Sequence, residues 1–517
     1  MELGFWKFAS ENPDALAVVS PDGSQTTAGQ LLSSANQVVH GLRALPQPLQ
    51  DRDAVAVVLD NCVEMLELFM AAAQAGWYLT PINHHLAPPE IEYIIKNCGA
   101  RAVVCSARFA EESLAALDNA EVPAEARFCV GEIEGFRPYE DLKAGQPTTA
   151  PEGRSAGATM TYTSGTTGRP KGVRRPAAQA TPEQVYTQQA LFLGLFGIYP
   201  GTKGVHLTVA PLYHTAVINF TTNAMHLGHT AVLMDKWTPE GTLERIERYG
   251  VTSSHMVPTQ FTRLLKAPKK VRESYDLSSL SHMIHSAAPC PVEVKREMLD
   301  WWGDCIYEYY AASEGGGTLA TPQQWRQKPG TVGAPWPISQ IMILDDDRQP
   351  VAANTPGTVW IRMGEHRFEY HEDQAKTDEA WREGFFTVGD AGYVDEDGFL
   401  FLCDRKADMI ISGGVNIYPA EIESVLVTHP KVGDVAVFGI PDDDWGEQVK
   451  AVVEAMPSVE TGPELAKELL DWCAGRLAKY KTPRSIDFVA ELPRDPNGKL
   501  FKRRLRDPYW EGRDRAI

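Results

Sequence analysis

Residues 160–173 read Met160-Thr-Tyr-Thr-Ser-Gly-Thr-Thr-Gly-Arg-Pro-Lys-Gly-Val173, a stretch rich in hydroxyl groups and glycines. Glycine lets the backbone turn tightly and approach a ligand closely, and consecutive exposed N–H groups form a concave nest that favours anions. The stretch therefore predicts a loop that holds a polyphosphate. Its spacing differs from that of a Walker loop, because Pro170 stands where that motif has its second glycine. The alternative is an ordinary surface connector rich in Ser, Thr and Gly.

The length and charge of the chain limit the classes of function. With 517 residues it is too long for one ordinary core and predicts roughly two to four domains or subdomains. A net charge of -19 argues against general electrostatic binding of nucleic acid and against strong attraction to anionic membranes. We therefore expect no nucleic-acid partner. The basic run from Arg494 to Arg506 is expected to be a solvated face.

The cysteines and the N-terminus indicate the compartment. The eight cysteines are scattered without a C-x-x-C pair, so neither a zinc site nor a redox motif is predicted. The first residues lack a basic segment followed by an apolar one, as a signal peptide would have, and no apolar run approaches the ~20 residues of a membrane-spanning helix. We expect a cytoplasmic protein without a transmembrane segment. Peripheral membrane contact and a homodimer both stay open.

Apolar runs alternate with amphipathic segments as far as residue 287. Ala54–Leu59 is a continuous apolar run, typical of a strand buried on both faces, and Cys62–Gly76 carries apolar residues at helical spacing. This alternation predicts an α/β fold with doubly wound parallel sheets.

After about residue 330 short β-like runs and turn clusters predict a β-rich subdomain. Beyond Asp404–Asp408 the pattern predicts a compact α+β unit. Its expected helices and strands are Ala420–His429, Glu464–Ala478, Val435–Ile440 and Val449–Ala455.

The segment from Thr163 to Gly172 resembles the phosphate loop of the adenylate-forming superfamily, which contains acyl-CoA synthetases, luciferases and the adenylation domains of peptide synthetases. Further motifs follow in the family's order along most of the chain. The resemblance implies an N-terminal adenylation domain (1–403), a hinge (404–408) and a small mobile C-terminal domain (409–517). It implies ATP, Mg²⁺ and coenzyme A as cofactor and co-substrates. The implied phosphate-contacting residues are Thr163, Ser164, Gly165, Thr166, Thr167, Gly168 and Lys171, with Thr166 also at the metal.

Two motifs imply the acyl-pocket mouth and the adenine turn. Ala210-Pro-Leu-Tyr-His-Thr215 resembles the family segment whose histidine, here His214, lies at the mouth of the acyl pocket. Ser286-Ala-Ala-Pro-Cys290 resembles the turn that runs along adenine, with alanine and serine in place of the usual glycines. The implied adenine contacts are Ala287, Ala288 and Pro289.

The segment Tyr310-Ala-Ala-Ser-Glu314 resembles the family motif Tyr-Gly-x-Thr-Glu. Tyr310 is then expected to stack on adenine, with Ala311 and Ser313 beside the nucleotide. Glu314 is expected to hold Mg²⁺, which prefers carboxylate and phosphate oxygens.

Motifs nearer the C-terminus imply the ribose, thiol and catalytic-lysine sites. In Thr387-Val-Gly-Asp390, Asp390 is expected to accept hydrogen bonds from both ribose hydroxyls. In the long match Asp404–Glu423, Arg405 is expected near the ribose and phosphate. Ser412, Gly413 and Gly414 are expected to border the pantetheine arm of coenzyme A.

The hinge and the catalytic lysine complete the set of motifs. Ala407 replaces the Asp or Lys that the family usually has at the pivot, which puts the balance between the two domain orientations in doubt. In Pro493-Arg-Asp-Pro-Asn-Gly-Lys499, Lys499 is expected to reach the substrate carboxylate and the α-phosphate. Without the other motifs, Lys499 would be taken for an exposed hairpin lysine.

The resemblance implies two steps: formation of an acyl-adenylate with release of pyrophosphate, then attack by the coenzyme A thiol with release of AMP. The expected acyl pocket is small or apolar, with no basic residue to pair a second carboxylate. We therefore predict a hydrophobic monocarboxylate, either a medium- to long-chain fatty acid or a polycyclic side-chain acid. The expected pocket residues are Ala216, Val217, Phe220, Ala311, Gly315 and Gly316.

Other functions stay open at this point. The activated acyl group could pass to an amine or a carrier protein. A kinase-like enzyme would release ADP and phosphate, and a regulatory protein could bind nucleotide without catalysis.

Overall fold

The computed structural model describes residues 3–117, 120, 122–163, 170–174, 180–312, 314–364, 368–371, 373–405, 408–494 and 500–511, and for residue 163 the backbone only. The chain divides into two compact units. The first contains Met1–His255, Lys269–Ile284 and His366–Glu379, and the second contains Met256–Pro268, His285–Glu365 and Ala380–Ile517.

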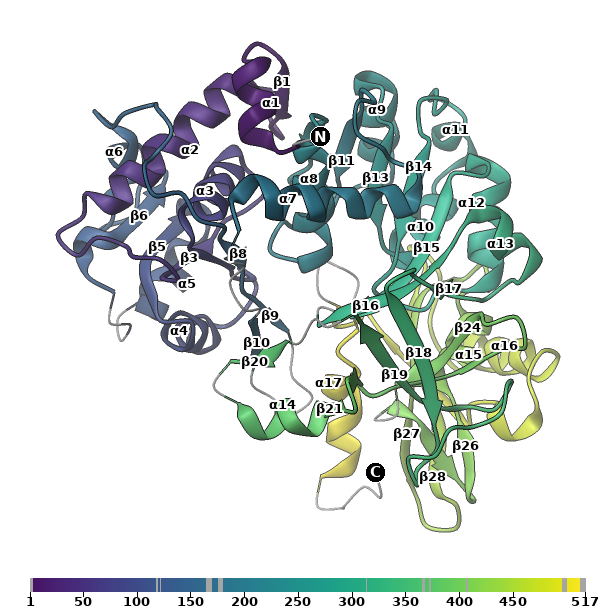
Figure 1. Ribbon diagram of the computed structural model, residues 1–517. Coiled ribbons are helices and arrows are strands. Elements are labelled where there is room, and N and C mark those ends of the chain that lie inside the picture. Colours follow the sequence, from purple (N-terminus) through teal and green to yellow (C-terminus); the bar gives the residue numbers. More distant parts are fainter. Residues whose placement is uncertain are drawn as a thin grey trace. The chain divides into compact units, whose positions relative to one another are not determined.

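The first unit contains an all-parallel sheet in the order β7-β6-β5-β3-β4-β8. Its strands in that order are Arg137–Pro138, Arg127–Val130, Ala100–Ser106, Ala54–Val58, Tyr78–Pro81 and Ala158–Thr159. The helices of this part, α2 to α6, are Ala28–Arg43, Val63–Ala75, Pro88–Asn97, Ala110–Leu117 and Tyr139–Lys143. Figure 1 shows helices on both sides of the central strands. The predicted alternation of buried strand and helix is confirmed here.

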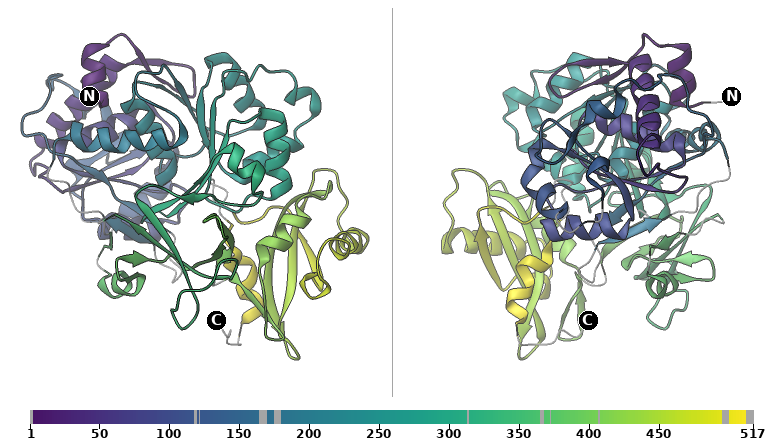
Figure 2. Two further views of the ribbon diagram at one scale, coloured as in Figure 1. Left: turned by 45° about the vertical axis from the view of Figure 1, so that its right-hand side comes forward. Right: turned by 90° about the vertical axis from the view of Figure 1, so that its left-hand side faces the viewer.

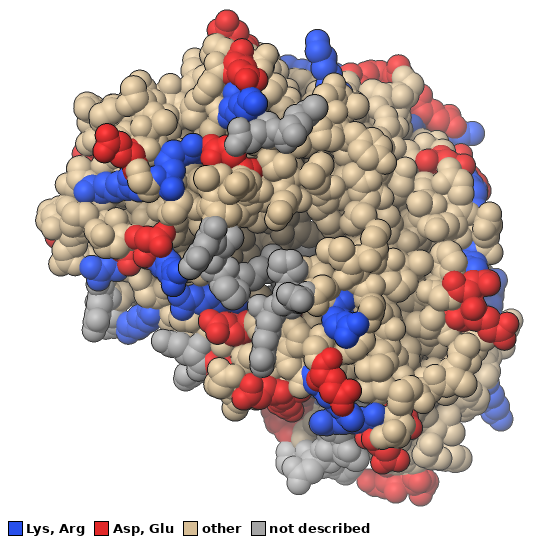
Figure 3. All heavy atoms as spheres, viewed as in Figure 1, with Lys and Arg blue, Asp and Glu red and all other residues tan. Residues whose placement is uncertain are grey.

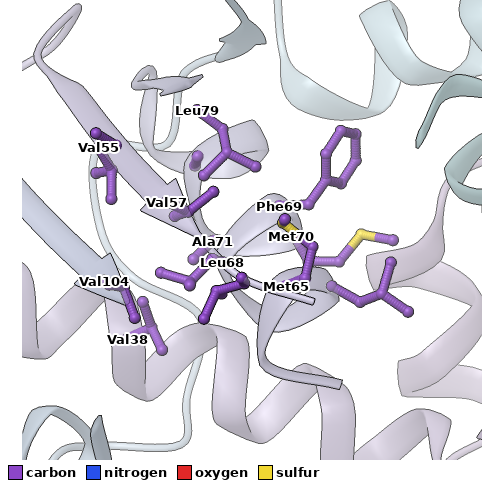
Figure 4. Packing of buried hydrophobic residues seen from close by; sticks show 14 of the residues in the cluster. Val38, Val55, Val57, Met65, Leu68, Phe69, Met70, Ala71, Leu79 and Val104 are labelled. Carbon is purple, nitrogen blue, oxygen red and sulfur yellow. The ribbon is translucent and has the colours of Figure 1, made fainter. Parts of the chain in front are cut away.

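The core of this sheet explains why the strands read as continuous apolar runs. Every residue of β3 is buried, because helices cover both faces of a parallel sheet. Figure 4 shows Val57 of β3 beside Ala71 and Leu68 of α3, and Val38 of α2 beside Val104 of β5, all in one apolar cluster. Each such side chain contributes ~1.5–3 kcal/mol on full burial.

The strands of a second sheet that are grouped with this unit follow one another in the order β14-β13-β11-β12-β1-β2. Its strands are His282–His285, Ser253–Met256, Val205–Thr208, Thr230–Leu233, Leu16–Val19 and Gln25–Thr27. Strands β13, β11, β12 and β1 run parallel, and β2 pairs antiparallel to β1. The associated helices α1, α7, α8, α9 and α11 are Phe5–Glu11, Pro182–Leu191, Thr215–His226, Pro239–Tyr249 and Lys269–Arg272.

A small antiparallel sheet in the order β20-β10-β9 completes the first unit. Its strands are Glu369–Tyr370, Lys171–Arg174 and Thr161–Thr163, and α14 follows at Gln374–Ala380.

The second unit contains the predicted β-rich part. Strands β15 (Ile306–Ala312), β16 (Gly315–Ala320) and β17 (Ala334–Pro335) pair antiparallel. A further antiparallel sheet has the order β21-β22-β19-β23-β24, with β18 also paired to β19. Its strands are Trp381–Arg382, Phe385–Phe386, Gly357–Met363, Asp390–Val394, Leu400–Arg405 and, for β18, Ser339–Leu344. Helices α10, α12 and α13 are Pro258–Lys266, Val292–Trp302 and Pro322–Gln327.

The C-terminal part of this unit is built on a sheet in the order β26-β25-β28-β27, with β29 parallel to β28. The strands β25 to β29 are Ile410–Ser412, Val415–Ile417, Val432–Asp442, Gly446–Ala455 and Ser485–Val489, and helices α15, α16 and α17 are Pro419–Leu426, Pro463–Ala474 and Lys502–Arg506.

Alternate residues of β27 face two different apolar clusters, as expected for a strand covered on both faces. Val435 and Val437 pack with the residues of α15 and α16, whereas Phe438 packs with Leu505 of α17. Helix α17 lies beside β27 (Figure 2).

Two predicted helices end earlier than expected. The helix predicted for Ala420–His429 ends at Leu426, where the chain tightens into a turn with the N–H of His429 on the carbonyl of Leu426. The residue before a proline avoids the helical region, which favours this early end. The helix predicted for Glu464–Ala478 spans Pro463–Ala474 because Gly475, a poor helix former, follows.

The predicted fold class, an α/β protein with doubly wound sheets and a β-rich part, is confirmed. The division at residues 404–408 stays a prediction. Among the described residues, no helix has both the length and the apolar character needed to cross a bilayer. Lysines and arginines alternate with acidic residues over the face seen in Figure 3, outside the atoms drawn in grey.

Candidate active site

A tyrosine, a carboxylate and an arginine from three strands of the second unit meet as the sequence predicted. The Tyr310 hydroxyl on β15 donates to Asp390 Oδ2 at 2.7 Å, and Arg405 Nε lies 3.6 Å from Asp390 Oδ1. Asp390 and Arg405 are directly opposite in the β23–β24 pairing. The register of one hairpin therefore sets the carboxylate beside the guanidinium, and β15 supplies the aromatic ring.

The Tyr310 hydroxyl is buried among charged groups that act on its ionisation. Burial, the Asp390 carboxylate and the charge of Glu314 raise the pKa of the Tyr310 phenol far above its usual value, and Arg405 acts in the opposite sense. Tyr310 therefore stays a neutral donor at physiological pH. A single carboxylate such as Glu314 suits Mg²⁺ when phosphate oxygens and water supply the other ligands. The described residues around Tyr310 thus fit a magnesium–nucleotide.

Glycines close the hairpin that carries Tyr310 and Glu314. The strand pairing shifts register between Ala311 and Ala312, and Gly315 and Gly316 adopt φ of 127° and 69°. A Cβ on Gly316 would lie 2.5 Å from Ile361 Cγ2, so the backbone here lies against β19. Gly315 and Gly316 are thus required for the hairpin, and a contact with the acyl group stays a prediction.

The predicted adenine turn follows β14 directly. Ala287 has φ of 76°, a left-handed conformation that glycine adopts without strain and that costs an alanine about 1–2 kcal/mol. The alanine that stands where the family usually has glycine therefore keeps the left-handed backbone conformation, at the cost of backbone strain. Ala288 and Pro289 follow in the same turn.

A buried ion pair lies directly behind this turn. Lys295 Nζ of α12 is 2.7 Å from Glu308 Oε2 of β15, with the two side chains 0% and 7% exposed, and His285 Nε2 is 3.6 Å from the same oxygen. His285 precedes the adenine turn in sequence, and Glu308 precedes Tyr310. Sequence reasoning missed this pair, because only the packing shows that two ordinary surface residue types are buried.

The two ends of the phosphate stretch, β9 and β10, pair as antiparallel strands in the first unit. Thr163 ends β9 and pairs with Lys171 on β10, whose Nζ lies 4.6 Å from the centre of the Tyr370 ring. The ammonium group is thus held over an aromatic face, a favourable cation–π contact. The predicted phosphate contacts Ser164, Gly165, Thr166, Thr167 and Gly168 lie outside the described residues, and so does Ser313.

His214 and three of the predicted acyl-pocket residues, Ala216, Val217 and Phe220, lie at the start of α8, whereas Ala311, Gly315 and Gly316 belong to β15 and β16. His214 is the N-cap residue of this helix and is half-buried, as is Ala216, whereas Val217 and Phe220 are buried. Val217 belongs to the main apolar core. The Phe220 ring stacks on His255 at 4.9 Å and contacts Phe196 at 5.4 Å.

The predicted thiol loop is a two-residue hairpin turn. Gly413 and Gly414 join β25 and β26 with φ of 57° and 76°, as a type I′ turn requires, and Ser412 pairs with Val415 across it. The N–H of Gly413 donates to the carbonyl of Trp445 at 2.8 Å, and the indole of Trp445 is 51% exposed. The sequence analysis missed Trp445, since an isolated tryptophan carries no spacing signal.

The two remaining predicted residues cannot be placed. Lys499 and Ala407 lie outside the described residues. Of the predicted nucleotide contacts that the structure describes in the second unit, Tyr310, Asp390 and Arg405 come together.

Comparison with known proteins agrees with this constellation. Residues 5–367 match the family model described as AMP-binding enzyme, and residues 421–499 match the AMP-binding enzyme C-terminal domain. The chain belongs to the AMP-binding enzyme family. As a member it is an adenylate-forming enzyme of the acyl-CoA synthetase type, an AMP-forming acid–thiol ligase.

Relatives within the AMP-binding enzyme family differ in acid and acceptor. The long-chain-fatty-acid–CoA ligase FadD13 of Mycobacterium tuberculosis is 30% identical over 504 residues, covering 97% of each chain. The fatty acid–[acyl-carrier-protein] ligase ScoC of Streptomyces coeruleorubidus is 30% identical over 522 residues, covering 98% of this chain and 96% of the relative. The structure of the anthranilate CoA ligase AuaEII with anthranoyl-AMP superposes with a TM-score of 0.85 at 25% identity, covering 98% and 97%.

Proposed function

We propose that this enzyme activates a hydrophobic monocarboxylic acid with MgATP, forms an acyl-adenylate with release of pyrophosphate, and passes the acyl group to coenzyme A with release of AMP. The observation that carries the proposal is the convergence of Tyr310, Asp390 and Arg405, with Glu314 four residues after Tyr310 in the chain. An aromatic ring, a ribose-binding carboxylate, a cation and a metal-binding carboxylate are the groups that a magnesium–nucleotide needs.

Each residue has one part in the proposed adenylation. Asp390 accepts hydrogen bonds from the ribose hydroxyls, and Tyr310 both fixes this carboxylate and offers its ring to adenine. Arg405 and Lys171 neutralise charge on the phosphates, while Glu314 with Thr166 holds Mg²⁺, which neutralises phosphate charge when bound. Catalysis is then mostly positioning and charge stabilisation, because the carboxylate oxygen itself attacks the α-phosphorus.

The apolar, aromatic surroundings of Phe220 on α8 support an apolar acid as the substrate. Phe220 is buried among aromatic rings, including Phe192 at 5.8 Å, and burial lowers the pKa of the stacked His255 to about 3. His255 is therefore neutral at pH 7 and cannot pair a second carboxylate. FadD13 carries a long-chain fatty acid in its name and AuaEII an aromatic acid. We propose a medium- to long-chain fatty acid or a polycyclic side-chain acid.

The surface beside the Gly413–Gly414 turn favours coenzyme A as the acceptor. The exposed indole of Trp445 has the guanidinium of Arg484 at 5.7 Å from its ring centre. An aromatic face with an adjacent cation suits a thiol that carries a nucleotide and phosphates. Transfer to a carrier protein is the second candidate, since ScoC is named for it.

The test is a pyrophosphate-release assay on the full chain over a panel of carboxylic acids, with coenzyme A, a holo-carrier protein or an amine as acceptor. We expect turnover with hydrophobic monocarboxylates and coenzyme A, and AMP as the second product. A preference for acetate or a dicarboxylate would refute the substrate class, and ADP with phosphate would refute adenylation. Transfer to carrier or amine but not to coenzyme A would refute the acceptor.

The role of Lys499 is tested separately in the two half-reactions. Lys499→Ala should abolish pyrophosphate release and largely spare thioester formation from a supplied acyl-adenylate. An equal loss in both steps would contradict the role proposed for Lys499. Chelation of Mg²⁺ should stop the first step and leave the second step nearly unchanged.

A further inference from the structure

The predicted adenine turn, residues 286–290, has a backbone conformation that its sequence does not favour. Ala287 has a positive φ of 76°, which strains an alanine. Ala287 and Pro289 are exposed, whereas His285 and Ser286 directly before them are buried. Strain of this kind persists only where the surrounding structure fixes the backbone. The turn is therefore held from its buried side.

One carboxylate contacts the chain on both sides of this turn. His285 is the last residue of β14, and its Nε2 lies 3.6 Å from Glu308 Oε2 on the neighbouring strand β15. Lys295 lies in the first helical turn of α12, where its N–H donates to the carbonyl of Pro291 at 3.1 Å. Its Nζ lies 2.7 Å from the same Glu308 oxygen. Glu308 thus contacts the residue before the turn and the helix after it.

Two aromatic rings pack against this pair and its histidine neighbour. Lys295 Nζ lies 4.9 Å from the centre of the Trp325 ring on α13, and the His285 ring contacts Phe261 of α10 at 5.1 Å. Burial lowers the pKa of Lys295 and raises that of Glu308, because their mutual attraction does not fully offset the loss of water. Such a pair adds little stability compared with an apolar pair of equal size.

We propose that Glu308, with Lys295 as its counter-ion, is a positioning residue that holds both ends of the predicted adenine turn and so keeps Ala287 in the left-handed conformation. The proposal rests on the proposed function, since it takes the exposed side of this turn as the adenine contact. Tyr310, the other expected adenine contact, lies two residues after Glu308 on β15. One strand therefore positions both expected adenine contacts.

Loss of the pair frees the turn and removes no group that is expected to touch the nucleotide. The strain at Ala287 then opposes the left-handed conformation, so fewer molecules have the binding-competent turn. The apparent affinity for a nucleotide falls by the same factor as that population. A pair that only stabilised the fold would lower the Tm and leave the affinity for AMP unchanged.

The experiment compares two matched double variants of the full chain. Lys295→Met/Glu308→Gln removes both charges with side chains of nearly equal size. The control, Lys143→Met/Glu67→Gln, does the same to a pair in the first unit that is 3.1 Å apart and 12% and 6% exposed. The affinity for AMP is measured by titration calorimetry, and hydrogen exchange of the peptide covering 286–291 is measured without nucleotide.

We expect Lys295→Met/Glu308→Gln to raise the Kd of AMP and to speed exchange of this peptide, each about tenfold, which corresponds to ~1.4 kcal/mol. The KM for ATP in pyrophosphate release should rise by a similar factor while kcat stays within about twofold, because saturating ATP restores the turn. The control variant should change none of these values more than about twofold, whatever its Tm.

A third substitution provides the rescue. Glycine adopts the φ of residue 287 without strain, so Ala287→Gly added to Lys295→Met/Glu308→Gln should restore most of the AMP affinity. An unchanged Kd in the double variant, an equal effect of the control, or no rescue by Ala287→Gly overturns the proposal.

Two outcomes need a separate reading. If Lys295→Met/Glu308→Gln does not fold, Lys295→Met/Glu308→Leu replaces the pair by apolar side chains, which buried pairs often tolerate, and it must give the same rise in Kd. If the wild type binds no AMP or releases no pyrophosphate, the proposed function is refuted. Exchange of the 286–291 peptide then decides the role of Glu308 by itself.

Discussion

The hydrogen bond between Tyr310 and Asp390 gives the sharpest quantitative prediction. It is 2.7 Å long, Tyr310 is 9% exposed, and the side chain of Asp390 is 15% exposed. A hydrogen bond to a charged group contributes about 1.5–3 kcal/mol, and little of that is lost to solvent here. The neighbouring Arg405 is 48% exposed, so its ion pair with Asp390 contributes less, about 0–1 kcal/mol.

The perturbation is a double-mutant cycle with Tyr310→Phe, Asp390→Ala and the double variant. The free energy of unfolding, taken from the same urea transition in all four proteins, should show a coupling of about 1.5–3 kcal/mol. As a control, Arg405→Gln with Asp390→Ala should couple by less than about 1 kcal/mol. A Tyr310–Asp390 coupling below ~0.5 kcal/mol would refute the reasoning, because it would mean that the bond is not formed in solution.

The KM for ATP distinguishes the roles of Tyr310 and Asp390 further. Tyr310→Phe keeps the ring for adenine and loses only the group that orients the carboxylate, so KM for ATP should rise less than about tenfold. Asp390→Ala also loses two hydrogen bonds from ribose to a charged acceptor, worth about 1.5 kcal/mol or more each, which predicts a rise of about a hundredfold or more. Equal effects of the two substitutions on KM for ATP would show that Asp390 does not bind the ribose.

Three further substitutions test separate parts of the enzyme. In Gly413→Ala the new Cβ would lie 2.4 Å from Trp445 Cε3, and the backbone at this position has a positive φ that strains an alanine. We expect the rate of thioester formation to fall about tenfold or more and the rate of pyrophosphate release to stay unchanged, measured in separate half-reaction assays. Burial lowers the pKa of His226 to about 3, so the unfolded chain binds its proton first, and His226 contributes a loss of stability of up to ~1.4 kcal/mol per pH unit below about 6.5. Because His206 and His255 contribute in the same way, His226→Asn should reduce the slope measured by calorimetry between pH 6.5 and 5 by about this one share. In Gly317→Ala the Cβ would lie 2.1 Å from the carbonyl oxygen of Tyr310, and calorimetric titration should show AMP affinity lost together with a lower Tm.

Much of the nucleotide site follows from local sequence. The tight reversal at Gly413–Gly414 has a local cause, because few residues other than glycine adopt two successive positive φ angles. Continuous apolar runs such as Ala54–Val58 predict buried parallel strands for an equally local reason. The motif residues Tyr310, Asp390 and Arg405 were predicted as one site from the family resemblance, and they meet.

The buried charges could not be predicted in the same way. Lys295 and Glu308 look like surface residues, and Lys502 belongs to a run that any composition argument assigns to solvent, yet all three side chains are at most 11% exposed. The two helix ends that were placed too late depend on a turn and on a glycine at the boundary. The burial of the charged side chains depends on neighbours that lie far away in the sequence, whereas the helix ends follow from Pro430 and Gly475 close to each boundary.

By itself the sequence determined the element types, the turn conformations and the chemical groups available, because φ preferences and hydrophobic spacing act over a few residues. Only the tertiary structure decided that the β23–β24 register sets Asp390 opposite Arg405, that Lys502 of α17 lies beside Glu423 of α15, and that Arg506 lies beside Asp408. The reason is that charge pairing and desolvation depend on distances through space, which the packed chain alone defines.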